Sequence, residues 1–219
     1  MIERYTRPEM GHLWSLENEW QTILNVEIAA CEAMAELGEI PAEAAENIKK
    51  NAKFDVARIC EIEKTTDHDI IAFLTNLEEN VGADSKYIHK GLTSSDVKDT
   101  AYCILMRDAA GLILAGLHEL RTVLRRRADE FRHTPCIGRT HGIHAEPMTF
   151  GLKLLLWSAE IERDIERLTR AQKTVSVGKL SGAVGTYSNI DMRIEALTCE
   201  KLGLTPVPLA TQVIQRDRH

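Results

Sequence analysis

Residues 95–132, SDVKDTAYCILMRDAAGLILAGLHELRTVLRRRADEFR, form the longest helical pattern of the chain. Apolar side chains recur along it at the three- and four-residue spacing that places them on one face of a helix. At 1.5 Å of rise per residue, the predicted helix is roughly 57 Å long. Its apolar stripe includes Val97, Ala101, Ile104, Leu105, Leu112, Leu117, Leu120, Leu124 and Phe131.

Further helices are predicted on both sides of this segment. Ser15 can cap a helix that runs to Leu37 and ends at Gly38, with Glu27 as a polar break in its apolar stripe. The other predicted helices open at Pro41, cover 55–63, 69–80 and about 148–175, run from Asp191 to Gly203, and begin near Thr211. The sequence therefore predicts an all-α chain.

The composition is that of a soluble globular protein, with 44% hydrophobic and 27% charged residues. A net charge of -6 argues against general binding to nucleic acid or to an anionic membrane. The five cysteines are odd in number and widely spaced, which argues against a disulfide framework or a zinc ribbon. The N-terminal residues do not resemble a signal segment, and no apolar run is expected to span a bilayer. We therefore expect a cytoplasmic protein.

The two longest predicted helices leave apolar surface to be covered. Two helices alone cannot bury their stripes against each other, because a bundle core needs faces from several sides. We expect the missing faces to come from other subunits, from a further C-terminal half, or from both.

Residues 138–147, GRTHGIHAEP, carry the strongest indication of chemistry. Their glycine and proline content predicts a loop between the long helices. His141 can act there as a general acid or base near neutral pH. An isolated loop histidine more often satisfies backbone groups, but the neighbouring His144, Glu146 and Arg139 favour function. A metal site is not expected, because the spacing of His141 and His144 matches no helical ligand pair and no cysteine assists.

Three other polar turns lie beside predicted helices: Arg4 with Tyr5, residues 66–69, and residues 89–96. His68 is flanked by two aspartates, which fits either an oriented functional imidazole or an exposed helix start. Thr93 and Ser94 fit a helix N-cap, and the same groups can bind a carboxylate or phosphate. The glycine-rich loop 178–187 fits a packed loop better than a phosphate loop.

Several of these motifs together resemble the adenylosuccinate lyase family, of the bacterial type, within the fumarase/aspartase superfamily. The motifs are MIERY (1–5), GLTSSDV (91–97), GRTHGIHAEP (138–147), SGAVGTY (181–187) and TQVIQRDRH (211–219). The resemblance runs in order along the chain, and argininosuccinate lyase looks different at both the Thr-Ser turn and the histidine loop.

The resemblance implies a β-elimination that releases fumarate from a succinylated purine nucleotide, adenylosuccinate or succinylaminoimidazole-carboxamide ribotide. It implies no metal or organic cofactor and a homotetramer whose sites combine residues of three subunits. By the same resemblance His141 is the general acid for the leaving nitrogen, and His68 assists it. By the same resemblance Arg4 and Tyr5 contact the phosphate or the base of the nucleotide. Two turns bind the substrate, Asp67 with His68 and Asp69, and Thr93 with Ser94, whose hydroxyls contact a succinyl carboxylate. His89 lies on the phosphate side, and Gln212 supplies an amide contact.

The family's signature loop, Ser-Ser-x-Met-Pro-x-Lys-x-Asn, has no counterpart in these 219 residues. That loop carries the general-base serine. The chain therefore resembles an N-terminal helical domain, residues 1–111, followed by the first part of a central helical bundle, residues 112–219. We expect this fragment to be inactive alone. The alternatives are another lyase of the superfamily and a non-catalytic helical oligomerisation module.

Overall fold

The computed structural model describes residues 2–219, which form two compact units. The first unit holds the described residues up to Asp108 together with Thr174–His219, and the second unit is Ala109–Lys173. Residues 174–219 thus group with the N-terminal part of the chain. The domain boundary between residues 111 and 112 stays a prediction.

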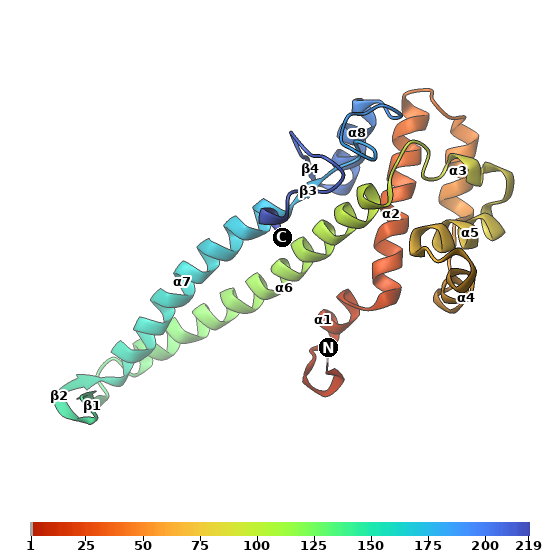
Figure 1. Cartoon of the computed structure of the whole chain (residues 1–219). Helices are drawn as coiled ribbons and strands as arrows, with labels where there is room; N and C mark the ends of the chain where they lie inside the picture. Colours follow the sequence, from red (N-terminus) through yellow and green to blue (C-terminus); the bar gives the residue numbers. More distant parts are fainter. Residues whose placement is uncertain (1) are drawn as a thin grey trace. The chain divides into compact units, whose positions relative to one another are not determined.

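The described residues contain eight α-helices, so the predicted all-α class is confirmed (Figure 1). The helices are α1 (Pro8–Leu13), α2 (Leu16–Glu36), α3 (Ala42–Asn51), α4 (Val56–Thr66), α5 (Asp69–Val81), α6 (Ser94–Glu130), α7 (Phe150–Val175) and α8 (Met192–Leu202). The smaller elements are the 3-10 helices η1 (Glu3–Tyr5), η2 (Gly82–Tyr87) and η3 (Arg216–Arg218), and the strands β1 (Pro135–Thr140), β2 (Ile143–Thr149), β3 (Val177–Gly178) and β4 (Thr205–Pro206).

The predicted helix starts are found where the capping residues place them. Ser15 Oγ accepts a hydrogen bond from the Asn18 N–H (3.2 Å) at the start of α2. Asp55 and Asp191 cap α4 and α8 in the same way, each at 2.8 Å. Each carboxylate or hydroxyl satisfies a backbone N–H that has no partner within its own helix.

The core of the first unit forms around α2, which packs against α3, α4 and α8. Trp20 on α2 stacks on Phe73 of α5, with ring centroids 4.9 Å apart. The first turns of α6 enter this core, where Val97 and Ala101 are buried. This core holds the short polar turns between helices in fixed positions.

Helix α6 is long and apolar enough, by length and composition, to cross a membrane. Its most apolar 18-residue window has a mean hydropathy of 1.4. This result is contrary to the expectation that no apolar segment is long enough to span a bilayer. However, the first turns of α6 carry the buried polar side chains Asp96 and Thr100 within the core of the first unit. The start of α6 therefore belongs to the core of the first unit.

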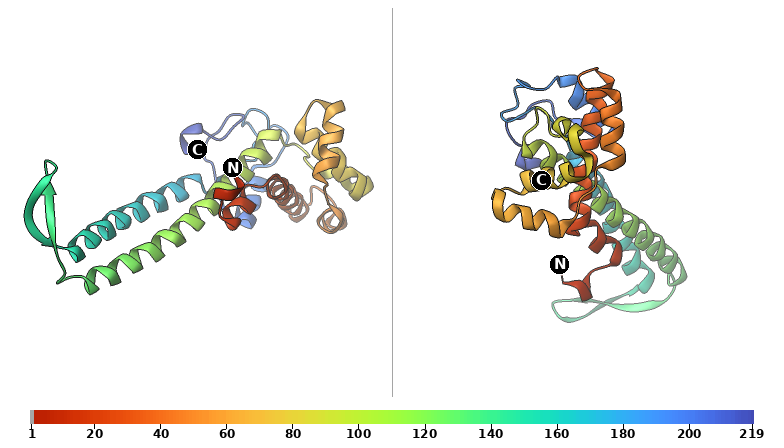
Figure 2. Two further views of the ribbon diagram at one scale, coloured as in Figure 1. Left: turned by 90° about the horizontal axis from the view of Figure 1, so that it is seen from below. Right: turned by 90° about the vertical axis from the view of Figure 1, so that its right-hand side faces the viewer.

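The second unit is a helical hairpin, in which the later part of α6 and most of α7 run antiparallel side by side (Figures 1 and 2). Glu162 on α7 accepts hydrogen bonds from both Arg121 and Arg125 of α6, each at 2.7 Å. Gly151 lets the helices approach, because a Cβ there would lie 2.4 Å from the Ala128 carbonyl oxygen. Much of the apolar surface of α7 stays exposed, including Leu152, Leu155, Leu156 and Trp157.

Residues 138–147 form a β-hairpin, so the prediction of an irregular loop is wrong. Strands β1 and β2 pair antiparallel, and Thr140 lies opposite Ile143. The two residues between them, His141 and Gly142, have φ values of 52° and 75°. Two consecutive positive φ angles match the twist of a tight hairpin turn, and glycine adopts them without steric cost. The glycine content that we interpreted as a loop thus belongs to a two-residue turn.

The predicted helix near Thr211 is also absent from the described residues, where only η3 follows. The Ile214 N–H donates to Asp99 Oδ2 (2.9 Å), and the Gln212 carbonyl accepts from Lys179 Nζ (2.9 Å). Side chains of α6 and of the 178–187 loop therefore use the backbone groups that a helix would need.

Candidate active site

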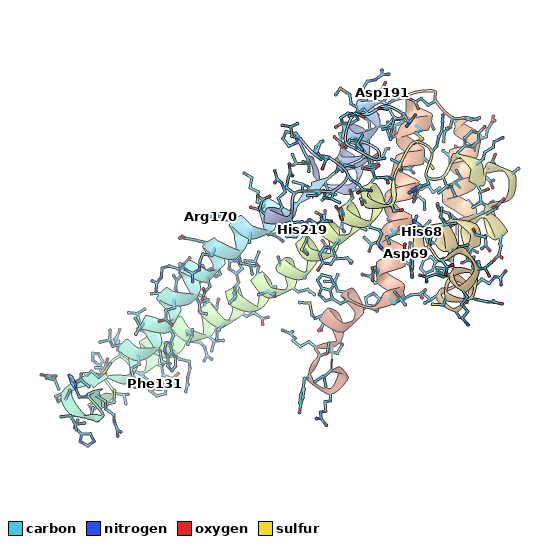
Figure 3. The ribbon with its side chains drawn as sticks, viewed as in Figure 1. His68, Asp69, Phe131, Arg170, Asp191 and His219 are labelled. Carbon is cyan, nitrogen blue, oxygen red and sulfur yellow. The ribbon has the colours of Figure 1, made fainter. Side chains whose placement is uncertain are left out.

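The turn between α4 and α5 presents His68 and Asp69 (Figure 3). Asp67 ends α4 in the left-handed region, with φ of 48°. His68 is the N-cap of α5, where its Nδ1 accepts a hydrogen bond from the Ile71 N–H (3.3 Å). A ring nitrogen that accepts carries no proton, so in the neutral form Nε2 holds the hydrogen. The half-exposed imidazole therefore offers an N–H donor away from the helix.

Asp69 joins this turn to α6, because its Oδ2 forms an ion pair with Lys98. Its Oδ1 also accepts from the Ile70 N–H (2.7 Å). Burial raises the pKa of Asp69, but the hydrogen bonds of Lys98 and Ile70 and the charge of Lys98 outweigh it, so the pKa lies below its ordinary value. Asp69 is thus held as a carboxylate beside the start of α6.

Thr93 and Ser94 lie at the N-terminus of α6. The Thr93 N–H donates to Asp96 Oδ2 (2.9 Å), which fixes the first turn of the helix. Both side chains are half-buried, and neither hydroxyl forms a hydrogen bond to another of the described residues. Free hydroxyls at the positive end of a 37-residue helix are suited to binding an anion.

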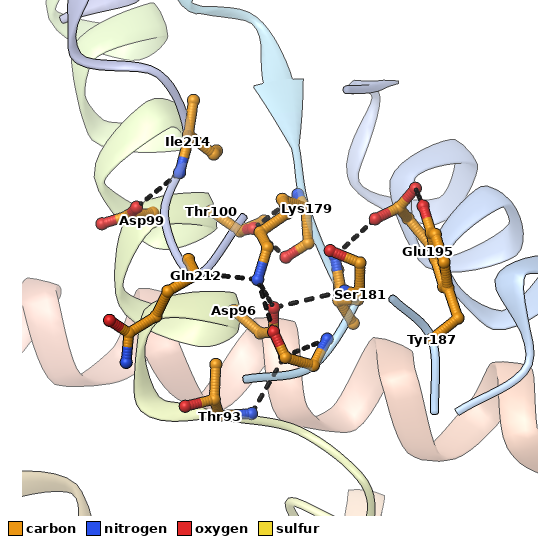
Figure 4. A network of polar contacts seen from close by, with 12 residues as sticks. Thr93, Asp96, Asp99, Thr100, Lys179, Ser181, Tyr187, Glu195, Gln212 and Ile214 are labelled. Carbon is orange, nitrogen blue, oxygen red and sulfur yellow. Dashed lines mark hydrogen bonds and ion pairs between the residues drawn. The ribbon is translucent and has the colours of Figure 1, made fainter. Parts of the chain in front are cut away.

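A fully buried ion pair lies behind this turn (Figure 4). Lys179 Nζ is 2.6 Å from Asp96 Oδ1, and both side chains are 0% exposed. Lys179 also donates to the Gly182 and Gln212 carbonyl oxygens, at 2.8 and 2.9 Å. Asp96 in turn accepts from the N–H groups of the 178–187 loop at residues 181 and 182. The pair therefore ties three segments, 93–96, 178–187 and 212, to one another.

The 178–187 loop is held by α8 as well. Glu195 accepts hydrogen bonds from the Leu180 N–H and the Tyr187 hydroxyl, both at 2.7 Å. Burial raises the pKa of both Glu195 and Tyr187. These contacts support the interpretation of 178–187 as a packed loop that positions its neighbours.

Gln212 reaches the same region from the opposite end of the chain. Its backbone carbonyl is bonded to Lys179, while its side-chain amide extends away from Lys179 (Figure 4). The amide forms no hydrogen bond to another described residue and is exposed. It is therefore available to a ligand.

His89 precedes the Thr93 turn and has a left-handed backbone, with φ of 62°. Its Nδ1 lies 2.5 Å from Glu27 Oε1, and Glu27 is fully buried on α2. Burial lowers the pKa of His89, but the hydrogen bond and charge of Glu27, together with the charge of Asp96, raise it above its ordinary value.

Arg4 and Tyr5 lie in η1, with the Arg4 guanidinium 4.8 Å from the centre of the Tyr5 ring. Both are exposed, and no hydrogen bond or ion pair joins either side chain to another candidate residue in the described part of the chain. The neighbouring Met1 lies outside the described residues. The structure therefore does not bring these two residues to the start of α6.

His141 belongs to the second unit, apart from all other candidates. It is exposed at the tip of the β1–β2 hairpin, with no side-chain hydrogen bond to another described residue. The structure thus gathers Asp69, Thr93, Gln212 and the adjoining His68 and His89 within the first unit, and leaves His141 in the second.

A family model described as "Lyase" matches residues 3–219. The chain belongs to this lyase family. The family falls within the fumarase/aspartase superfamily, which confirms the resemblance found in the sequence.

Curated relatives of the chain carry a more specific name. Proteins named adenylosuccinate lyase from Synechocystis sp., Bacillus subtilis and Staphylococcus saprophyticus are 55%, 52% and 49% identical to the chain over 219 residues. Each match covers 100% of this chain and 51% of the relative. The chain therefore spans about half the length of the curated relatives it matches.

Solved structures with other names share the fold. A fumarate lyase from Mesorhizobium sp. BNC1 has a TM-score of 0.88 at 29% identity, over 94% of this chain and 50% of that one. A 3-carboxy-cis,cis-muconate lactonizing enzyme from Pseudomonas putida has a TM-score of 0.89 at 30% identity, over 98% of this chain and 51% of that one. The fold thus occurs in proteins with several different names.

Three residues that hold the candidate site residues in place were missed as site residues in the sequence. Glu27 did stand out, as an acidic residue within an apolar stripe. Lys179 and Lys98 carried no comparable signal, because their partners Asp96 and Asp69 lie 83 and 29 residues away. Only the folded chain brings these charges together.

Proposed function

We propose that the full-length protein catalyses the β-elimination of fumarate from adenylosuccinate, giving AMP, and from succinylaminoimidazole-carboxamide ribotide. One observation carries this proposal: identity of 49–55% along all 219 residues with three proteins named adenylosuccinate lyase. The differently named solved structures share only 26–30% of aligned residues. The substrate is thus a small purine nucleotide.

The reaction needs a base, an acid and a site for negative charge. A base removes the proton from the carbon beside a carboxylate, the carbon–nitrogen bond breaks, and an acid protonates the leaving nitrogen as fumarate departs. We assign the acid to His141, whose exposed ring on a tight turn has both nitrogens available for proton transfer. The base is the serine of the family's signature loop, which has no counterpart in these 219 residues.

The groups at the start of α6 bind the succinyl part of the substrate. The free hydroxyls of Thr93 and Ser94, with the helix N-terminus behind them, suit a carboxylate and stabilise charge that develops during elimination. His68 assists as a donor beside Asp67 and Asp69. The side-chain amide of Gln212 supplies a further polar contact.

The nucleotide part is bound by different residues. His89 contacts the phosphate, because a buried carboxylate favours its cationic form. Arg4 and Tyr5 contact the phosphate or the base; their exposure and their lack of other partners among the described residues leave them available for such contacts.

We further propose a cytoplasmic homotetramer in which each site combines residues of three subunits. The exposed apolar side chains of α7, Leu152, Leu155, Leu156 and Trp157, support association, because another subunit would remove their surface from water. Joining subunits would also let His141 of one subunit serve the α6 turn of another. Under this proposal residues 1–111 and 112–219 belong to successive domains, and the 219-residue chain is inactive alone.

The test is an assay of the purified full-length protein with adenylosuccinate, in which fumarate and AMP are both quantified. We expect equal amounts of the two products, and no fumarate from argininosuccinate. Faster release from argininosuccinate would point to another lyase of the superfamily. No release from either compound would favour a non-catalytic helical module, and either result would overturn the proposal.

A further inference from the structure

Glu27 is a buried acid in an apolar environment. It is 0% exposed, and its neighbours on the same face of α2, Ile23, Leu24, Cys31 and Met34, are buried as well. An ionised carboxylate in such surroundings is costly unless a cation and hydrogen bonds compensate it. Packing alone does not compensate for the cost of burying Glu27, so a polar group that it contacts must do so.

That partner is His89, which uses both carboxylate oxygens. Nδ1 of the ring lies 2.5 Å from Oε1, and the His89 backbone N–H donates to Oε2 (3.0 Å). The backbone is left-handed, a conformation that few residues other than glycine adopt. The Leu92 N–H closes the turn on the His89 carbonyl (3.2 Å). Backbone and ring are therefore fixed together, with Nδ1 facing the protein interior.

The other charged groups near His89 do not replace Glu27. Asp96 on α6 acts on His89 through its charge, but it is already bonded to Lys179. The ammonium of Lys90 points to the Glu39 carbonyl oxygen (3.3 Å). Glu27 is thus the carboxylate in direct contact with the ring, and the contact favours a proton on Nδ1.

The second ring nitrogen is left for a ligand. Nε2 forms no hydrogen bond to another of the residues described in the structure, and the side chain keeps 15% of its surface exposed. With Nδ1 protonated by its contact to Glu27, a proton on Nε2 makes the ring a cation and an N–H donor. This donor stands four residues before Thr93, whose hydroxyl is also free.

We propose that Glu27 is a positioning residue that orients His89 and keeps it cationic, so that Nε2–H binds the phosphate group of the substrate. This inference rests on the proposed function, since it takes the ligand to be a nucleotide. Glu27 itself does not touch the ligand. Its effect is to keep His89 able to donate a hydrogen bond to the phosphate throughout the neutral pH range.

The variant that tests this is Glu27→Gln in the full-length protein, with Glu36→Gln as the matched control. Glu36 lies on the same helix, is half-exposed and pairs with Lys201 (2.6 Å) on the surface. We expect Glu27→Gln to raise KM for adenylosuccinate about tenfold or more, the usual effect of losing a charged hydrogen bond, with a smaller change in kcat. KM for the analogue without the 5′-phosphate should stay unchanged, as should both values in the control. An equal rise of KM for both substrates would mean that Glu27 only stabilises the fold, and would overturn the inference.

A measurement of the imidazole itself separates this inference from the proposed function. NMR titration of His89 should give a pKa above the ordinary value in the unaltered protein and a lower pKa in Glu27→Gln, where only the charge of Asp96 still opposes burial. Inorganic phosphate should shift the His89 signals in the unaltered protein near neutral pH, and not in the variant. These results would support the inference even if adenylosuccinate releases no fumarate.

The unaltered protein suffices if Glu27→Gln fails to fold. An ordinary or lowered pKa of His89, or no response of its signals to inorganic phosphate, overturns the inference. His89→Asn, whose side chain tolerates the left-handed backbone, should show the same phosphate-dependent rise of KM.

Discussion

Replacing Lys179 by methionine should loosen the turns around the start of α6 without changing the volume of the core greatly. Methionine keeps most of the aliphatic chain of lysine but has no ammonium. The change leaves the Asp96 carboxylate buried without its cation, and removes the donor to the Gly182 and Gln212 carbonyl oxygens.

The magnitude follows from the burial of the pair, since both side chains are 0% exposed. Removing one partner of a buried ion pair typically costs about 3–5 kcal/mol, because the other charge stays in the interior without compensation. At about 1.4 kcal/mol for each factor of ten, the local opening equilibrium should rise by about two to three and a half powers of ten.

Hydrogen exchange of the backbone amides that donate to Asp96, those of Thr93, Ser181 and Gly182, reports this opening directly. It is preferable to a single free energy of unfolding, which is poorly defined for a protein of several units. The control is Lys201→Met, which removes a surface ion pair worth about 0–1 kcal/mol. The double variant Asp96→Asn with Lys179→Met should lose less amide protection than the sum of the losses in the two single variants. Protection of these amides within about threefold of the control would show that Lys179 does not stabilise the turns around Asp96.

Three further predictions concern the scaffold and one carboxylate of the site. Gly151→Ala should destabilise the helical hairpin by about 1–3 kcal/mol, since its Cβ would lie 2.4 Å from a backbone carbonyl oxygen. Gly116→Ala on α6, where an added Cβ meets no atom within 4 Å, should instead stabilise the hairpin by about 0.5–1 kcal/mol. Equal thermal unfolding temperatures for the Gly116→Ala and Gly151→Ala variants would contradict this. Ser15→Ala should lower the stability of the start of α2 by about 0.5–2 kcal/mol, which would be measured as faster amide exchange in the first turn of the helix. Unchanged exchange there would show that Ser15 does not stabilise the helix. Lys98→Met should raise the pKa of Asp69, because burial then acts without the opposing ammonium. In the unaltered protein the Asp69 carboxylate contributes stability above its ordinary pKa, and this stability is lost as the pH falls through the lowered pKa of the folded state. Lys98→Met should reduce that contribution. An unchanged titration of the Asp69 carboxyl group by NMR would refute this.

The helices were predictable because their signals are local. Ser15, Asp55 and Asp191 each cap a helix within three residues of themselves, and the apolar stripes repeat within each segment. The hairpin at 138–147 was missed because glycine and proline mark turns of every kind, and the two positive φ angles at His141 and Gly142 distinguish a tight hairpin from a loop only in the structure. The helix predicted near Thr211 is absent for a non-local reason, because distant side chains form hydrogen bonds with backbone groups that the helix would need.

The candidate site was predictable in its polar turns but not in what holds them. His68, His89 and Thr93 stood out as clusters of polar groups beside helices. The pairing of Asp96 with Lys179, and of Glu27 with His89, joins residues 83 and 62 positions apart, which no local pattern encodes. Charge pairs of this kind follow from the packing of α2, α6 and the 178–187 loop.

The role of His141 is tested most directly by the rate of fumarate release from adenylosuccinate by the full-length protein carrying His141→Ala. We predict a fall in kcat of about 10²–10⁴, the usual contribution of a general acid, with little change in KM. A kcat within about threefold of the unaltered protein would show that the proton for the leaving nitrogen comes from a group other than His141.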